Sequence, residues 1–189
     1  KSSAPGILKV SPNASTPGTD SIVVSVPDGT QYVYYHTQGM EGTSGTATVT
    51  ASAAGFTDGS AVWTVESAKL AIVSLSTTTT AAAADDPFQV YVGIASGSGV
   101  SGQNIRAGGT ALTATVTSSN PTAGTLTVTA GSAPSVSVTI PVGLYYSPTT
   151  VAAGGVAVNP VAAGSATVTA AIPGLVAEPD ATQVVTINP

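Results

Sequence analysis

The 189-residue sequence predicts an all-β protein made of two related modules. Three observations carry this prediction: the composition, the alternation of apolar and polar residues along short segments, and an internal repeat. The chain holds 29 Thr, 25 Val and 30 Ala but only 7 Leu, and Glu and Lys together number 6. Branched residues such as valine and threonine favour strands, whereas helices draw on leucine, glutamate and lysine.

Alternation with a period of two marks the individual strands. In GTATVTA at residues 45–51, small apolar residues fall on one face and threonines on the other, and the same holds at 112–116, 136–140 and 166–170. Each segment predicts a half-buried strand of a two-layer structure. The candidate strands are residues 7–10, 21–26, 31–36, 45–52, 60–66, 71–80, 88–95, 111–118, 124–129, 135–140, 144–151, 155–159, 164–171 and 182–188. The alternation predicts that the buried set includes Val24, Val26, Val49, Val138, Ile140, Ala166 and Val168.

Three segments recur in the same order along the chain. SIVVSVPDG at 21–29 matches SVSVTIPVG at 135–143, with an offset of 114. GTATVTA at 45–51 matches GSATVTA at 164–170, with an offset of 119, and SAVWTV at 60–65 matches TQVVTI at 182–187, with an offset of 122. Because the order is kept and the offset drifts only slowly, the chain contains two copies of one module.

The two copies differ in length. We expect a partial sandwich over residues 1–66, a short hinge over 67–70 and a complete sandwich over 71–189. All five candidate strands of the first copy align with the later part of the second. The counterpart of roughly residues 71–123, which would supply the opening strands, is missing from the first copy.

The motifs of the second copy resemble the bacterial immunoglobulin-like (Big-type) repeat family. They are TSSNP at 117–121, GTLTV at 124–128, VTIPVG at 138–143 and AAGSATVTA at 162–170. The first copy carries only the later part, as VSVPDG at 24–29 and GTATVTA at 45–51. The resemblance implies tandem immunoglobulin-like β-sandwiches in an exported protein, placed outside the cell or on its surface. It implies roles as stalks, adhesin shafts, fibres or accessory domains of enzymes, with no general catalytic residues.

Composition excludes several functions. Four Lys and Arg residues cannot form the basic surface that neutralises nucleic-acid phosphates. No apolar run approaches the roughly 18 residues of a membrane span. The absence of cysteine removes thiol nucleophiles and cysteine-ligated metals. We therefore expect neither a nucleic-acid partner nor a transmembrane segment.

Catalytic constellations are not evident in the sequence. His36 is the only histidine, and it lies beside tyrosines in the predicted strand 31–36 without a Gly-x-Ser-x-Gly elbow elsewhere. The glycine-rich segment 97–102 precedes further strands rather than a helix, which predicts a flexible loop and not a dinucleotide site. No Asp or Glu occurs between residues 87 and 177. This part of the chain therefore cannot supply the pair of carboxylates that glycoside hydrolysis requires. We expect no enzyme activity and no cofactor.

Two sets of residues are candidates for binding. Glu66, Glu178 and Asp180 would supply oxygen ligands for calcium if the two modules brought them together, although scattered acids more often only solvate loops. Tyr32, Tyr34 and Tyr35 follow one Pro-x-Gly turn, and Tyr145 and Tyr146 follow its counterpart. Tyrosines exposed in this way could contact a protein or stack on a sugar.

The leading hypothesis is a structural module of an extracellular shaft, sheath or self-assembling filament. The alternative is an adhesin or carbohydrate-binding accessory module that uses the tyrosines or the loop from Ser96 to Thr110. The partial first copy predicts that residues 7–66 are completed by outside strands, either from another copy of the protein or from adjacent parts of a longer chain. The rival hypothesis is that residues 7–66 close on themselves as a small truncated sandwich.

Overall fold

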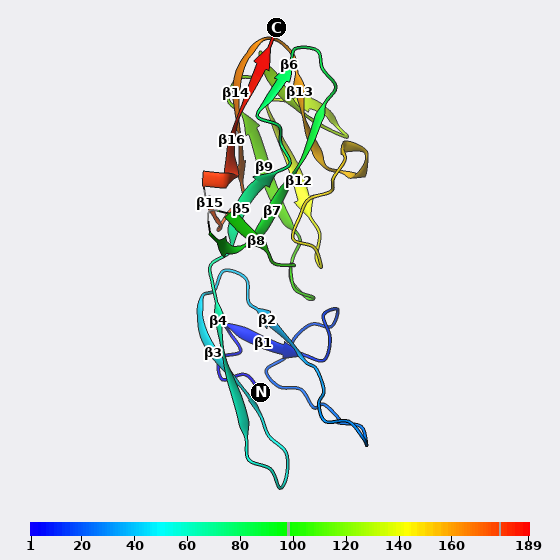
Figure 1. The fold of residues 1–189 in the computed structure, drawn as a ribbon, viewed down its shortest axis with the longest axis vertical. Helices are drawn as coiled ribbons and strands as arrows, with labels where there is room; N and C mark the ends of the chain where they lie inside the picture. Colours follow the sequence, from blue (N-terminus) through cyan, green and yellow to red (C-terminus); the bar gives the residue numbers. More distant parts are fainter. Residues whose placement is uncertain (98, 178) are drawn as a thin grey trace. The chain divides into compact units, whose positions relative to one another are not determined.

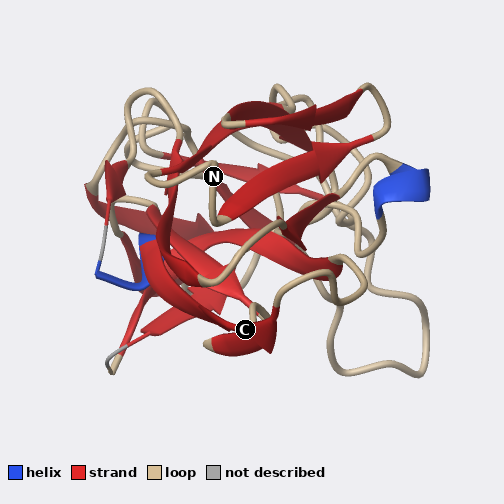
Figure 2. Cartoon of the chain, turned by 90° about the horizontal axis from the view of Figure 1, so that it is seen from above, coloured by secondary structure: helices blue, strands red, loops and turns tan. Residues whose placement is uncertain are grey.

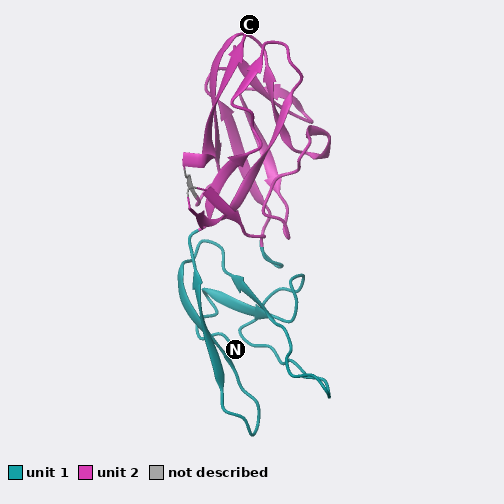
Figure 3. Cartoon of the chain, in the orientation of Figure 1, with its two compact units in different colours: residues 1–67, 106–109 teal, residues 68–105, 110–189 magenta. Residues whose placement is uncertain are grey.

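Nearly all of the regular structure is β (Figure 1), in a computed structural model that describes residues 1–97, 99–177 and 179–189. The chain divides into two compact units (Figure 3). Unit 1 comprises Lys1–Ser67 with Arg106–Gly109, and unit 2 comprises Ala68–Ile105 and Thr110–Pro189. Figure 2 shows how little helix there is: η1 (Val151–Ala153) and η2 (Pro179–Ala181) are single 3-10 turns. No helix in the described ranges is long and apolar enough to cross a membrane. The predicted all-β fold class is confirmed.

Unit 2 consists of two sheets packed face to face. The first has the strand order β11–β10–β13–β7–β5–β15, with β8 paired to β7, and the second has the order β12–β9–β14–β16–β6. The strands of the first sheet are β5 (Lys69–Val73), β7 (Asp86–Ser96), β8 (Gly99–Gly102), β10 (Gly124–Val128), β11 (Gly131–Ala133), β13 (Val156–Pro160) and β15 (Val176–Ala177). Those of the second are β6 (Thr78–Thr80), β9 (Leu112–Ser118), β12 (Ser135–Ile140), β14 (Gly164–Ala171) and β16 (Thr182–Asn188).

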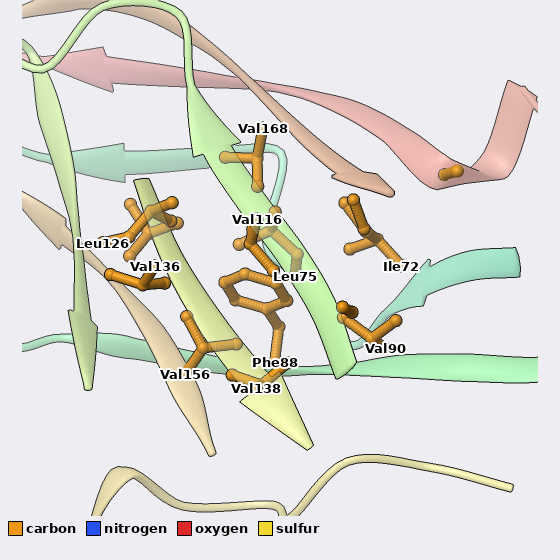
Figure 4. Close-up of a cluster of buried hydrophobic side chains, with 14 of the residues drawn as sticks. Ile72, Leu75, Phe88, Val90, Val116, Leu126, Val136, Val138, Val156 and Val168 are labelled. Carbon is orange, nitrogen blue, oxygen red and sulfur yellow. The ribbon is translucent and has the colours of Figure 1, made fainter. Parts of the chain in front are cut away.

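Alternate residues of these strands fill the space between the sheets (Figure 4). Phe88 and Val90 of β7 come from the first sheet, and Val116, Val138 and Val168 come from the second. Each is almost fully buried. Burying a side chain of this size stabilises the fold by about 1.5–3 kcal/mol. The threonines and serines between them face outward, so the alternation in the sequence becomes the two faces of each sheet.

The first strand of unit 2 changes sheets, which the sequence did not predict. The predicted strand 71–80 is instead two strands, with β5 antiparallel to β7 in the first sheet and β6 parallel to β16 in the second. Ser74, with a φ of 65°, lies in the left-handed region between them. The Asp86 Oδ2 accepts the Ser76 N–H at 2.9 Å and holds the crossing segment.

Unit 1 contains two strand pairs. β1 (Leu8–Ser11) pairs with β2 (His36–Gly39), and β3 (Gly45–Ala51) pairs with β4 (Gly59–Val65), both antiparallel. The core between them is small. It holds Leu8, Val10, Ala47 and Val49, with Ala4, Ile22 and Val65 packed partly against it.

Three predicted strands do not form. Residues 21–26 and 144–151 lie outside the strands, and only His36 of the predicted strand 31–36 belongs to one. Val24 and Val26, expected in the interior, are 41% and 54% exposed, so that prediction is wrong for both. The burial predicted for the other members of the set is confirmed: Val49, Val138, Ile140, Ala166 and Val168.

The buried face of β14 gives a test of the core. Val168→Asp should lower the free energy of unfolding by more than about 3 kcal/mol, because it places an unpaired carboxylate between the sheets. Ser165→Asp, at an exposed position of the same strand, should change it by less than about 0.5 kcal/mol. Urea unfolding measures both variants. A wild-type midpoint for the Val168 variant would show that the assigned face is inverted.

Candidate functional site

The first residues of unit 1 make the bonds that the end of β9 makes in unit 2. The Ser3 N–H donates to the Thr48 carbonyl oxygen of β3 at 2.9 Å, and the Ser119 N–H donates to the Thr167 carbonyl oxygen of β14 at 2.9 Å. In return the Thr48 N–H donates to Ser3 Oγ, and the Thr167 N–H donates to Ser119 Oγ, each at 2.9 Å. Since β3 and β14 are repeats of each other, Ser3 occupies the place of Ser119.

The same correspondence holds on the opposite side of this strand. The Ser2 N–H donates to the Asp20 carbonyl oxygen at 2.8 Å, just as the Ser118 N–H donates to the Pro134 carbonyl oxygen at 2.8 Å. Asp20 and Pro134 immediately precede the repeated segments 21–26 and 135–140. Residues 1–3 therefore lie where β9 ends, with β3 on one side and the start of segment 21–26 on the other. Figure 1 draws the N-terminus between these two parts of unit 1.

Sequence reasoning missed this correspondence, although a signal for it exists. SSAP at residues 2–5 matches SSNP at 118–121 with an offset of 116. The turns that follow these two segments have the same hydrogen bond. The Leu8 N–H donates to the Ala4 carbonyl oxygen, and the Gly124 N–H donates to the Asn120 carbonyl oxygen. β1 is thus the counterpart of β10, and unit 1 contains the module from the last residues of β9 onward.

Segment 21–26 lacks the strand partner that its counterpart has. In unit 2, β12 pairs along its whole length with β9 and with no other described strand. Within the described part of unit 1, nothing pairs with segment 21–26 as a strand. Its inward positions become more exposed along the segment: Ile22 is half-buried, Val24 is 41% exposed and Val26 is 54% exposed. Burial falls with distance from Ser2, the last residue that supports the segment.

A second open edge belongs to β4. Its counterpart β16 pairs with β14 on one side and with β6 on the other. Among the described strands of unit 1, β4 pairs with β3 alone. Trp63 is therefore 41% exposed, whereas Val185, at the matching position of β16, is 1% exposed. Val62 beside it is also exposed.

The two groups of tyrosines lie in different environments. Tyr32 and Tyr34 are 68% and 76% exposed, and their rings form an edge contact with centroids 5.3 Å apart. Tyr35 is exposed as well. All three lie in the loop that replaces the predicted strand 31–36, and His36 begins β2 at an exposed position.

Tyr145 and Tyr146 are held by β7. The Val92 N–H donates to the Tyr145 carbonyl oxygen at 2.8 Å, and both rings contact Tyr91, which sequence reasoning did not select. Burial raises the pKa of the Tyr91 phenol above its usual value of 10.0, with the phenols of Tyr145 and Tyr146 adding to the shift. Tyr145 also packs against the core of unit 2. The repeated tyrosines therefore differ because only unit 2 contains β7.

The remaining candidates, those predicted to bind calcium, lie in different parts of the chain. Glu66 is exposed in unit 1, Asp180 lies in η2 of unit 2, and Glu178 lies outside the described residues. Of the residues that the structure describes, no three His, Cys, Asp or Glu side chains are grouped as metal ligands would be. The calcium site stays an untested prediction.

In the glycine-rich segment 97–102, of which residue 98 lies outside the described residues, Gly99–Gly102 form the strand β8, where a flexible loop was predicted. β8 pairs with β7 from Ser96↔Gly99 to Gly93↔Gly102. A Cβ on Gly93 would lie 1.9 Å from the Ser101 carbonyl oxygen, and one on Gly102 would lie 2.2 Å from the Tyr145 ring. These two glycines are needed for close packing rather than for binding a phosphate.

Deletion of residues 1–3 tests their structural role. The Thr50 N–H donates to the Lys1 carbonyl oxygen at 2.9 Å and the Thr48 N–H to Ser3 Oγ, so both amides should exchange with solvent faster after deletion. Hydrogen exchange followed by NMR measures this. The Thr167 amide of β14 serves as the control and should not change. Unchanged exchange at Thr48 and Thr50 would contradict the correspondence with β9.

The chain matches no protein-family model, and no curated protein matches it. It is similar to the solved structure of surface layer protein SbsC, domains 1–6, with 18% sequence identity and a TM-score of 0.38. The match covers 100% of this chain and 19% of that one, so the chain spans about a fifth of that structure's length. These comparisons do not assign the chain to a family.

Proposed function

We propose that the chain is a non-catalytic structural module of an extracellular or cell-surface shaft, sheath or self-assembling filament. Its partners are then other copies of itself or adjacent domains of a longer chain, and not nucleic acid. The observation that carries the proposal is the set of unpaired strand edges in unit 1. The counterparts of these edges in unit 2 are covered by strands β9 and β6.

The free edge of β4 is suited to pairing with another chain. An edge strand presents a row of unpaired N–H and C=O groups, and natural proteins usually protect such edges with charges, prolines or bulges. β4 (Gly59–Val65) contains neither a charged residue nor a proline, and its apolar side chains Val62 and Trp63 are exposed. Pairing with another strand would satisfy the backbone groups of this edge and cover part of the Trp63 side chain.

The low charge of the chain also supports assembly. Only 7% of its residues are charged, and the formal net charge is −5. Copies of the chain therefore repel one another weakly when they approach. The proposed extracellular location is supported by the resemblance of the sequence to bacterial immunoglobulin-like repeats.

Val62→Lys tests assembly through β4. A lysine on an open edge opposes strand pairing. The dissociation constant for self-association of the variant should therefore be at least about tenfold higher than that of the wild-type chain. Val184→Lys is the matched control, because Val184 is the exposed counterpart of Val62 on β16, whose edges are both paired. Sedimentation velocity over a range of concentrations measures the association. A wild-type chain that stays monomeric throughout would contradict self-assembly.

The exposed pair Tyr32 and Tyr34 supports a second candidate function, carbohydrate binding by an adhesin or accessory module. Aromatic faces stack on sugar rings, and two adjacent exposed rings offer such a surface. On a glycan array, selective binding should be lost in Tyr34→Ala and kept in Tyr145→Ala, because Tyr145 packs into unit 2. No selective binding by the wild-type chain would remove this candidate.

A further inference from the structure

The loop that follows β1 carries an asparagine in the pattern that accepts N-linked glycans. In Asn13-Ala14-Ser15, here called the sequon, a hydroxyl residue lies two positions after the asparagine with no proline between them. Asn13 is the only one of the five asparagines of the sequence that is followed in this way. Asn120 has a threonine at the same spacing, but the proline between them prevents glycosylation.

The loop is anchored at its base, whereas all three residues of the sequon are exposed. Ser11 is buried, and its Oγ lies 2.7 Å from the Asn13 carbonyl oxygen and 2.8 Å from that of Thr16. The buried Gln38 of β2 donates from Nε2 to the same Thr16 carbonyl oxygen at 2.9 Å. The sequon therefore stands at the surface of unit 1 on a fixed base.

The side-chain amide of Asn13 has its oxygen engaged and its nitrogen accessible. Asn13 Oδ1 accepts both the Ser15 N–H and the Ser15 Oγ–H, each at 3.0 Å. Asn13 Nδ2, the atom to which a glycan is attached, donates no hydrogen bond to any residue that the structure describes. At Asn120 the corresponding nitrogen donates to the Ser165 carbonyl oxygen at 3.0 Å. The amide and the hydroxyl that a glycosyltransferase recognises are thus adjacent and accessible at Asn13 but not at Asn120.

The exposure of this loop does not depend on the strands that unit 1 lacks. Its counterpart in unit 2 is the turn between β10 and β11, where residues 129–131 are exposed although those strands are present. At the repeat offset of 116, Gly131 matches Ser15, and a Cβ on Gly131 would meet no atom beyond its chain neighbours within 4 Å. The offset falls to 114 by residue 21, so the loop of unit 1 is also two residues longer. A glycan on Asn13 would therefore extend into solvent from a complete unit as well.

We propose that Asn13 is an N-glycosylation site, which accepts an oligosaccharide from a polyprenyl pyrophosphate donor. Asn13 Nδ2 forms a bond to the anomeric carbon of the first sugar and loses one proton. The bond between that carbon and the donor oxygen breaks, and the polyprenyl pyrophosphate leaves with the bonding electrons. The inference goes beyond the proposed function and shares with it only the export of the chain, because sequons are modified in secreted proteins.

An oligosaccharide at this position would supply hydration that the side chains supply sparingly. Only 7% of the residues are charged. Glycans are bulky and increase solubility. A glycan on Asn13 keeps the loop after β1 in solvent and so restricts contacts between copies of the chain to other surfaces.

Peptide mapping by mass spectrometry tests the site in the chain isolated from the cells that make it. We expect a glycan on the peptide that contains Asn13, and we expect the amidase that releases N-linked glycans to convert this side chain to a carboxylate. Asn120 is the internal control and should remain an unmodified asparagine. A peptide map in which Asn13 is unmodified would overturn the proposal.

Variants of the full chain, exported from a eukaryotic host behind a cleavable signal sequence, separate glycosylation from folding. Asn13→Asp keeps the oxygen that accepts from Ser15, so it should be secreted like the wild-type chain but lack the glycan. Ser15→Ala should also lose the glycan, whereas Ser15→Thr should keep it. Glycan that persists in Asn13→Asp or Ser15→Ala would contradict the assigned site. Sedimentation of the unglycosylated chain from bacterial cytoplasm measures self-association separately, so failure of this site is distinguishable from failure of the proposed function.

Discussion

Both units depend on whether a strand fills the place of β9, which in unit 2 pairs with a strand on each side. A backbone segment in a sheet must satisfy its N–H and C=O groups along each covered edge, and an alternating sequence cannot do so alone. Where β9 is present, β12 is a strand and its valines are buried. Where only residues 1–3 stand in for it, the equivalent segment 21–26 leaves the sheet and exposes the same kind of side chains. The difference between the units arises from the partner rather than from the local sequence.

The local pattern predicts a strand wherever the partner strand is also present. The strands near 45–51, 135–140 and 164–171 follow the period of two closely, and their inward residues are buried as expected. The pattern fails at Val24 and Val26, which alternate as well as Val136 and Val138 do, because burial there requires residues distant in sequence. Local alternation also cannot reveal the bend at Ser74. This serine has a positive φ, which is uncommon for residues other than glycine, and it lies where the chain passes from one sheet to the other.

The candidate site was only partly within reach of sequence reasoning. The repeat identified which strands the first copy lacks and placed the tyrosines at matching positions. It did not show that the Tyr145 ring contacts Tyr91 of β7 whereas the Tyr34 ring contacts Tyr32 of its own loop, since β7 has no counterpart in the first copy. The match between SSAP and SSNP is four residues long, too short to be noticed without the hydrogen bonds that the two segments share.

The crossing of the first strand of unit 2 has a mechanical consequence. β6 and β16 run parallel from Thr78↔Thr186 to Thr80↔Asn188, and the pairing continues at both ends through the Thr77 carbonyl oxygen and the Ala81 N–H. Tension applied between the beginning of unit 2 and its last strand pulls these two strands in opposite directions along their common axis. The hydrogen bonds are then loaded in shear and resist together, whereas bonds at the end of a hairpin would open one at a time. The parallel pairing of β6 with β16 therefore opposes the extension of unit 2.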